Sequence, residues 1–299
     1  MDLLSQYGSY EFLPYLSNSS PPDTPQRSLA KILPSTQPQA ESSLTLQNTS
    51  TWTYCGPLLV PNSITLPPSL HTWTTTTVSS PSAFFSRLLP LLTFLRTFLS
   101  EAGVHHYWLT VRATKPTTEY DKPRWHVDDD FFAPTGSIDG DRVQEKKSRR
   151  EKSEARWKVC TTLLGPSTLF LPSPTALPHL RRVKSHQKKS REHPCTSVRC
   201  LGCADTGDVI RQTLAKDFTG EDVESHKYGE VAFFRLGDQK GAVHSEPKCD
   251  VDRIFINVVP GTEEEMRALM ARWGMGFPRA WCFGVPVGLV RSDEFDRPK

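Results

Sequence analysis

Two short segments, far apart in the sequence, carry side chains of the types that bind metal ions. One contains His126 and Asp128, within the run Arg-Trp-His-Val-Asp, and the other ends at His244. Side chains two residues apart in a β-strand point to the same face, so His126 and Asp128 can bind one ion while a neighbouring strand supplies His244. Two imidazoles and one carboxylate are the ligands of non-haem Fe(II) sites, which keep further positions open. The sequence therefore predicts a metal site formed by these three residues.

The position of Arg253, nine residues after His244, adds to this prediction. Taken alone, a His-x-Asp pair is weakly specific and could lie at a polar strand edge, and His244 could be a core histidine. A hairpin turning about Lys248 and Cys249 would place Arg253 opposite His244, and opposed residues of an antiparallel pair share a face. A buried arginine needs an anionic partner and matches the geometry of a carboxylate. Arg253 is therefore expected to bind a carboxylate ligand beside the metal; a surface cation at a strand start is the alternative.

A second cluster of metal-binding side-chain types comprises His193, Cys195, Cys200 and Cys203. A Cys-x2-Cys pair with two further ligands can hold structural zinc. Because the spacing is not that of a standard zinc finger, a plain cysteine-containing loop is the alternative.

Composition limits the class of protein. A chain of 299 residues with 37% hydrophobic residues and 25 prolines suggests a folded core with polar extensions. A net charge of +3 is too small to predict nucleic-acid binding. Seven cysteines without a secretory signal predict an intracellular protein, cytoplasmic or nuclear, with reduced thiols. The apolar run 84–99 contains Arg87, Pro90 and Arg96 and is expected to be too short and too charged to span a membrane.

Two basic runs, 145–152 and 181–191, could bind nucleic acid or an import factor. They lack interleaved aromatic residues, which favours solvated charged loops. A basic loop beside the metal site could also position an anionic substrate.

The elements expected around the site are mostly short strands. Residues 1–50, rich in Ser, Thr, Pro and Gln, are predicted to be disordered, and 51–79 to form a linker or edge strands, including the run HTWTTTTV. Helices are expected at 81–103, capped by Ser80 or Ser82 and broken near Pro90, and at 262–273, capped by Thr262. Strands are expected at 106–112, 123–132, 157–164, 168–171 and 230–236, with 241–245 and 253–259 forming a pair.

Two charged insertions, 136–155 and 180–225, lack apolar periodicity and are predicted to be protease-sensitive and dispensable for folding. Without βαβ alternation, residues 80–299 are expected to form one mainly β, α+β domain, an antiparallel barrel or jelly roll with flanking helices.

The order of several motifs resembles a bacterial and fungal family of domains of unknown function. The matching runs are RWHVD, WKVCTTLLGPSTLFLP, GEVAFFRLGDQKGAVHSEP and RIFINVVPG, and together they cover roughly residues 105–260. In that family a His-x-Asp precedes a Gly-Pro-Gly-Thr stretch and a Gly-Asp-Val-Ala strand that leads to a His. Here Gly165-Pro166-Ser167-Thr168 and Gly229-Glu230-Val231-Ala232 stand at those places. The family looks like a branch of the Fe(II)/2-oxoglutarate dioxygenases, which have the double-stranded β-helix fold.

The resemblance implies an oxidoreductase that hydroxylates or demethylates an unknown substrate. Catalytic Fe(II) would be held by His126, Asp128 and His244, and Arg253 would bind the distal carboxylate of 2-oxoglutarate. Many dioxygenases carry Arg-x-Ser at this place, whereas here Phe255 replaces the serine. A non-catalytic metal- or ligand-binding β-helix protein, or a nucleic-acid-associated factor using the basic insertions, are the alternatives.

Overall fold

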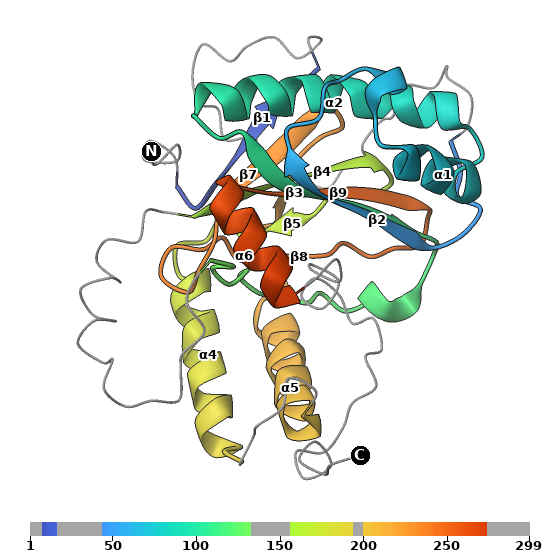
Figure 1. Cartoon of the computed structure of the whole chain (residues 1–299). Coiled ribbons are helices and arrows are strands. Elements are labelled where there is room, and N and C mark those ends of the chain that lie inside the picture. Colours follow the sequence, from blue (N-terminus) through green and yellow to red (C-terminus); the bar gives the residue numbers. More distant parts are fainter. Residues whose placement is uncertain (1–7, 17–43, 133–155, 194–199, 274–299) are drawn as a thin grey trace, which may run out of the picture.

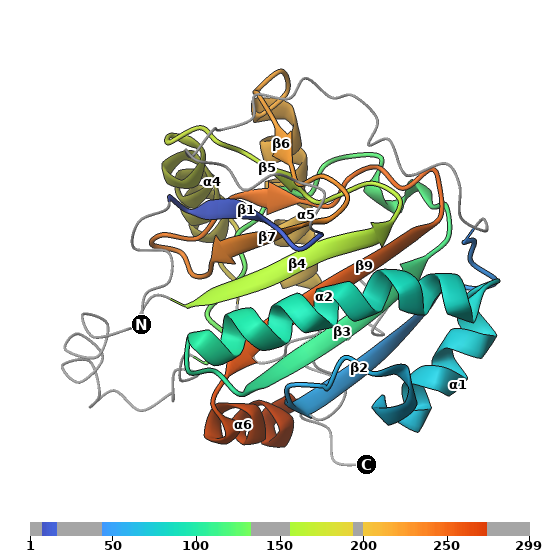
Figure 2. The same ribbon diagram turned by 90° about the horizontal axis from the view of Figure 1, so that it is seen from above.

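The computed structural model describes residues 8–16, 44–132, 156–193 and 200–273. Its centre is an antiparallel sheet of six strands in the order β1-β7-β4-β9-β3-β2 (Figure 2). These strands are β1 (Tyr10–Pro14), β2 (Ser50–Pro57), β3 (His106–Thr114), β4 (Trp157–Leu164), β7 (Glu230–Arg235) and β9 (Arg253–Gly261). The expected insertion 136–155 and Cys195 lie outside the described residues.

A second, smaller sheet contains β5 (Leu169–Phe170), β6 (Glu224–Ser225) and β8 (His244–Ser245) in the order β6-β5-β8. A single β-bridge between His126 and His244 adds the segment of the first histidine to its edge. From β3 onward the chain passes back and forth between the large and the small sheet. The expectation of a mainly antiparallel β, α+β fold is confirmed.

The predicted hairpin between 241–245 and 253–259 is wrong. Strand β8 pairs with β5 in the small sheet, whereas β9 pairs with β3 and β4 in the large sheet. The turn-rich residues between them carry the chain from one sheet to the other, a path that strand spacing alone cannot distinguish from a hairpin.

The helices are α1 (Pro68–Thr77), α2 (Pro81–Glu101), α4 (Ala176–Ser190), α5 (Leu201–Asp217) and α6 (Glu263–Trp273), with short 3-10 turns η1 (Ser63–Thr65) and η2 (Thr118–Tyr120). Helix α2 lies along one face of the large sheet (Figures 1 and 2). The helix is continuous through Pro90, where a break was expected. The expected cap Ser80 accepts a hydrogen bond from the Ala83 amide, and Gly103, with a positive φ of 73°, follows the end of the helix. Among the described helices, α2 alone is long and apolar enough to cross a membrane, and its buried leucines pack in the main core as those of a core helix do.

Two N-terminal expectations are corrected. The Thr-rich run expected as an edge strand forms α1, because Leu70, Trp73, Thr74 and Thr77 recur at helical spacing and are buried on one side. Strand β1 lies inside the segment predicted to be disordered. Its alternating side chains pack against apolar residues on both faces of the large sheet, a contact that the composition of the segment conceals.

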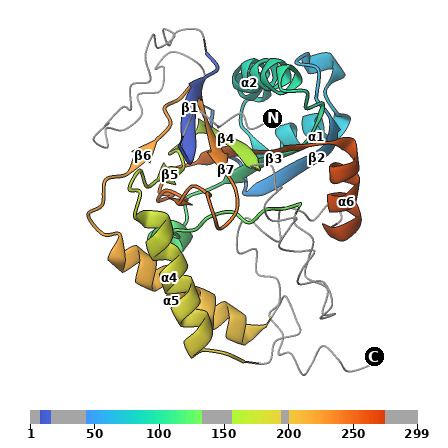
Figure 3. The same ribbon diagram turned by 90° about the vertical axis from the view of Figure 1, so that its left-hand side faces the viewer.

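The insertion 180–225 is also different from its prediction as a charged loop. It contains α5 and the greater part of α4, which begins before it at Ala176. Leu180, Val183, Ile210 and Leu214 on these helices, and Phe218 directly after α5, share a buried cluster with Trp125, Val127 and Val243. The apolar residues recur three or four positions apart among charged neighbours, so they form a narrow stripe. The basic run 181–191 is therefore mostly the outer side of a packed helix. Helices α4 and α5 lie beyond the small sheet, away from α2 (Figure 3).

Candidate metal centre

The structure brings His126, Asp128 and His244 together, and we call them the triad. The backbone amide of each histidine donates to the carbonyl of the other, both at 2.9 Å, and the two ring centroids are 4.3 Å apart. One carboxylate oxygen of Asp128 lies 3.6 Å from His126 Nε2, and the other lies 3.6 Å from His244 Nε2. The three ligand atoms all lie within 4.8 Å of one another, close enough to share one ion.

Hydrogen bonds fix the way both imidazoles face. His126 Nδ1 lies 2.7 Å from the Arg124 carbonyl, and His244 Nδ1 lies 3.0 Å from the Ala242 carbonyl. A carbonyl only accepts, so Nδ1 carries the proton in both rings and Nε2 keeps a lone pair. Metal-binding histidines are held in this way by their second nitrogen. Both lone pairs point to the side where Asp128 lies.

The charge state of the triad suits a cation. Burial alone would raise the pKa of Asp128, but Lys158, His244 and His126 together hold that pKa well below its ordinary value. Lys158, itself buried on β4, donates to Asp128 at 2.6 Å. Burial, and then the neighbouring His126, lower the pKa of His244 to about 4. Near neutral pH the site therefore offers an ionised carboxylate and a neutral His244, which are the protonation states that metal binding requires.

Aromatic rings line the inner side of the triad. Phe170 stacks on His244 with centroids 5.7 Å apart, and Phe234 lies at 4.9 Å from the same ring. On the outer side, Trp125, Val127 and Val243, the chain neighbours of the ligands, pack against α4 and α5. The helical insertion thus supports the two segments that carry the ligands.

Arg253 is buried, with 1% of its surface exposed. Its Nε donates to the Pro166 carbonyl at 2.9 Å, and one terminal nitrogen lies 3.4 Å from Thr168 Oγ1. Burial, followed by the neighbouring Arg112, lowers its pKa to about 10. Within the described ranges, no carboxylate lies within ion-pair distance of Arg253. Its strand neighbour is Thr114 on β3, so the expected hairpin partner His244 does not lie opposite it.

Several polar residues of the inner face were missed by the sequence analysis. Strand register places Thr110, Asn257 and Cys160 in one row across three strands, and Arg112, Phe255 and Thr162 in the next. The buried Arg112 pairs with Glu246 at 3.5 Å. The hydroxyls of Thr110 and Thr162 and both amide atoms of Asn257 are buried and lack a hydrogen-bond partner among the described residues. A charged or polar residue at every second position of an apolar strand, as in Trp-Lys-Val-Cys-Thr-Thr, was the available signal.

A second group of potential metal ligands also comes together. His193, Cys200 and Cys203 lie with their ligand atoms within 4.8 Å of one another, and we call them the Cys/His cluster.

Comparison of the chain with protein-family models, with curated proteins and with solved structures finds no match.

Proposed function

We propose that this protein is an oxidoreductase of the Fe(II)/2-oxoglutarate dioxygenase type, with the triad as its iron site. The observation that carries the proposal is the convergence of two imidazole lone pairs and one carboxylate, with both Nδ1 atoms bonded to carbonyls. Structural zinc sites are built with cysteine thiolates, which the triad lacks, whereas non-haem Fe(II) takes two histidines and one carboxylate and keeps other positions open. The donor set therefore fits iron.

The path of the chain supports the same proposal. We infer that the alternation of strands between the large and small sheets is that of a jelly roll, the double-stranded β-helix of the dioxygenases. In this arrangement the His-x-Asp segment and β8 are neighbours at the edge of the small sheet, and they carry all three ligands.

Arg253 supports 2-oxoglutarate as the co-substrate. Arg253 is buried and has no carboxylate partner within the described ranges, which costs folding free energy. One carboxylate of a bound dicarboxylate would neutralise the guanidinium through a bidentate contact. Arg253 contacts Thr168, and the ring of Phe170 stacks on His244. Thr168 and Phe170 are two residues apart, a spacing that spans roughly 6.6 Å of extended chain. This span is comparable with the extended length of a five-carbon diacid. One end of the molecule would then lie at the triad and the other at Arg253.

The remaining inner residues would serve binding and orientation. The unpaired groups of Thr110, Thr162 and Asn257 would donate to or accept from a bound co-substrate or substrate, since buried polar groups in native structures have partners. Lys158 would keep Asp128 ionised and fixed in place. Bound iron would supply the oxidation of a substrate C–H bond, coupled to decarboxylation of 2-oxoglutarate. A hydroxylated or demethylated product is the proposed outcome.

The proposal is tested by titrating the metal-free protein with Fe(II) under nitrogen. Wild-type protein should bind one iron per chain at the triad, and both His126→Ala and His244→Ala should bind it at least about 100-fold more weakly, because each removes one of three ligands. His71→Ala, which changes a half-buried histidine on α1 outside both sites, is the matched control and should bind like wild type. Circular dichroism checks that each variant is folded. Full iron occupancy at wild-type affinity in either triad variant would reject the assignment.

Catalysis is separated from metal binding by a second measurement. Iron-loaded protein should release carbon dioxide from 2-oxoglutarate slowly even without a substrate. A protein that binds iron and 2-oxoglutarate without releasing carbon dioxide would instead be a non-catalytic ligand-binding β-helix protein. If the protein bound nucleic acid through the basic face of α4 and took up no metal, the nucleic-acid-associated alternative would stand.

A further inference from the structure

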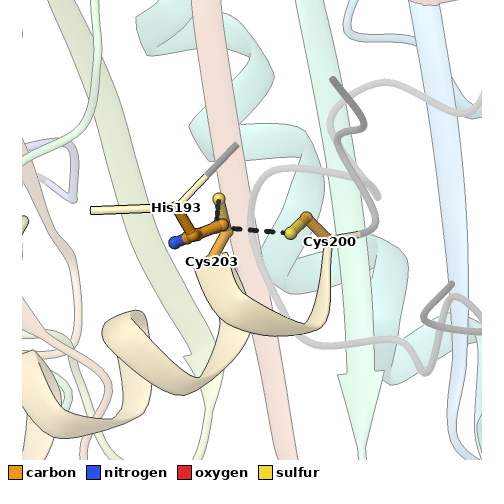
Figure 4. Close-up of side chains that lie close together, drawn as sticks. All are labelled: His193, Cys200 and Cys203. Atoms are coloured by element: carbon orange, nitrogen blue, oxygen red, sulfur yellow. Dashed lines mark hydrogen bonds between the residues drawn. The ribbon is translucent and has the colours of Figure 1, made fainter. Parts of the chain in front are cut away.

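The Cys/His cluster lies where α4 and α5 approach the same point. His193 follows the end of α4, and Cys200 and Cys203 lie at the start of α5. His193 Nε2 is 3.3 Å from the sulfur of Cys200 and 3.4 Å from that of Cys203 (Figure 4). The imidazole thus faces both sulfurs at nearly equal distances, as ligands gathered around one ion do.

His193 is oriented in the same way as the triad histidines. Its Nδ1 lies 2.9 Å from the Arg191 carbonyl, so Nδ1 carries the proton and Nε2 faces the sulfurs. The position between the cysteines also fits this approach. A Cβ atom at Gly202 would lie 2.8 Å from His193 Nε2, so a larger residue there would push the imidazole away. Glycine therefore gives the ring room to reach both sulfurs.

We propose that His193, Cys200 and Cys203 bind a structural Zn²⁺ that clips the end of α4 to the start of α5. Two soft thiolates together with an imidazole favour zinc, at bond lengths of roughly 2.0 to 2.3 Å. Zinc takes four ligands in such a site, and water can supply the fourth. The described atoms need to move by little to reach such distances around a shared ion.

The clip would stabilise the surroundings of the triad from a distance. Helices α4 and α5 share their apolar cluster with Trp125, Val127 and Val243, the chain neighbours of the triad ligands. A metal ion that holds the end of α4 against the start of α5 would lower the entropic cost of packing the two helices against the ligand segments. The zinc site itself does not depend on the proposed function, because the cluster contains no triad residue.

The test uses the full-length chain, reduced, metal-free and reconstituted with Co²⁺ in place of zinc. Cobalt bound by thiolates has a sulfur-to-metal charge-transfer band in the near ultraviolet, which the triad cannot produce because it has no sulfur. We expect this band in wild-type protein and in the His126→Ala/His244→Ala double variant. Cys203→Ser, which changes an exposed side chain, should lose most of the band and bind zinc at least about 100-fold more weakly. Cys55→Ser, a half-buried cysteine on β2, is the control and should keep both.

Two results would overturn the proposal. One is a reduced wild-type protein that gives no thiolate band with excess cobalt, including the case in which Cys200 and Cys203 only form a disulfide on oxidation. The other is a Cys203→Ser protein that keeps the band and its zinc affinity. Because Cys200 is buried and its replacement could unfold α5, His193→Gln is the second variant, and it should weaken zinc binding in the same way as Cys203→Ser.

Discussion

The triad and the Cys/His cluster are two candidate metal sites with opposite designs. The triad takes nitrogen and oxygen ligands from segments that only the folded sheets bring together. The Cys/His cluster takes sulfur and nitrogen ligands from eleven consecutive residues, 193–203. The first set suits a reactive metal with open positions, and the second suits a metal that holds the chain. Under the two proposals, this chain would separate catalytic from structural metal binding by ligand type and by sequence distance.

The two sites also differ in their electrostatic environment. The triad is lined by aromatic rings on its inner side, and a buried cation, Lys158, is bonded to one of its ligands. The Cys/His cluster has one exposed cysteine and no comparable buried cation within the described residues. Changes at the triad should therefore affect both folding stability and metal binding, whereas changes at an exposed position of the cluster should mainly affect metal binding.

The largest expected effect of this difference is that of Asp128→Asn. The change removes a metal ligand and leaves the Lys158 ammonium buried without its ionised partner, which costs about 3–5 kcal/mol. We expect the free energy of unfolding to fall by that amount and iron binding to be lost, while zinc binding at the cluster stays unchanged. Urea denaturation and metal analysis measure the two effects.

A second change provides the control for this prediction. Adding Lys158→Met to Asp128→Asn removes the isolated charge while a long apolar chain still packs near Phe131 and Phe234, so most of the lost stability should return without iron binding. A double variant as unstable as Asp128→Asn alone would show that the buried ion pair is not the cause.

A smaller effect on iron is expected from the helices behind the triad. Leu214→Ala on α5 and Leu88→Ala on α2 each remove a fully buried leucine and should each cost about 2–5 kcal/mol of stability. Only Leu214 packs in the cluster that supports the ligand segments, so only Leu214→Ala should also weaken iron binding, by about tenfold. Iron titration of both variants at a temperature where they remain folded makes the comparison. Equal losses of iron affinity would show that the helical insertion gives no specific support.

Much of the β framework could be predicted from the sequence. Runs of apolar and β-branched residues gave β3, β4, β7 and β9, and Thr262 forms the expected cap, accepting from the Glu265 amide while Glu265 accepts from the Thr262 amide. The pairing of His126 with Asp128 followed from their spacing of two residues, whereas the addition of His244 rested on its residue type and on the family resemblance. The strands, the cap and the His126–Asp128 pair depend on local pattern, which the sequence displays directly.

The errors have a common physical cause, because they concern contacts between distant segments. The partners of β8 and β9 depend on which sheet each strand joins, and a turn-rich segment is compatible with either choice. The burial of Lys158 could not be predicted, because its ion-pair partner Asp128 lies 30 residues away in the sequence. The stripe on α4 and α5 is short and surrounded by charge, so its burial depends on the small sheet that it covers. Strand β1 is likewise stabilised by its partner β7 rather than by its own composition.

The central claim is that iron at the triad and a dicarboxylate at Arg253 share one site. It is tested most directly by titrating iron-loaded protein with 2-oxoglutarate under nitrogen and following the visible metal-to-ligand charge-transfer band. Wild-type protein should develop the band. Arg253→Ala should keep its iron but bind 2-oxoglutarate about 30- to 1,000-fold more weakly. This loss corresponds to about 2–4 kcal/mol for a buried charge-assisted contact. The affinity of Arg253→Lys should fall between those of wild type and Arg253→Ala, because lysine keeps the charge but loses the bidentate geometry. If wild-type and Arg253→Ala protein bound 2-oxoglutarate equally, or if neither bound it, the co-substrate assignment would be contradicted.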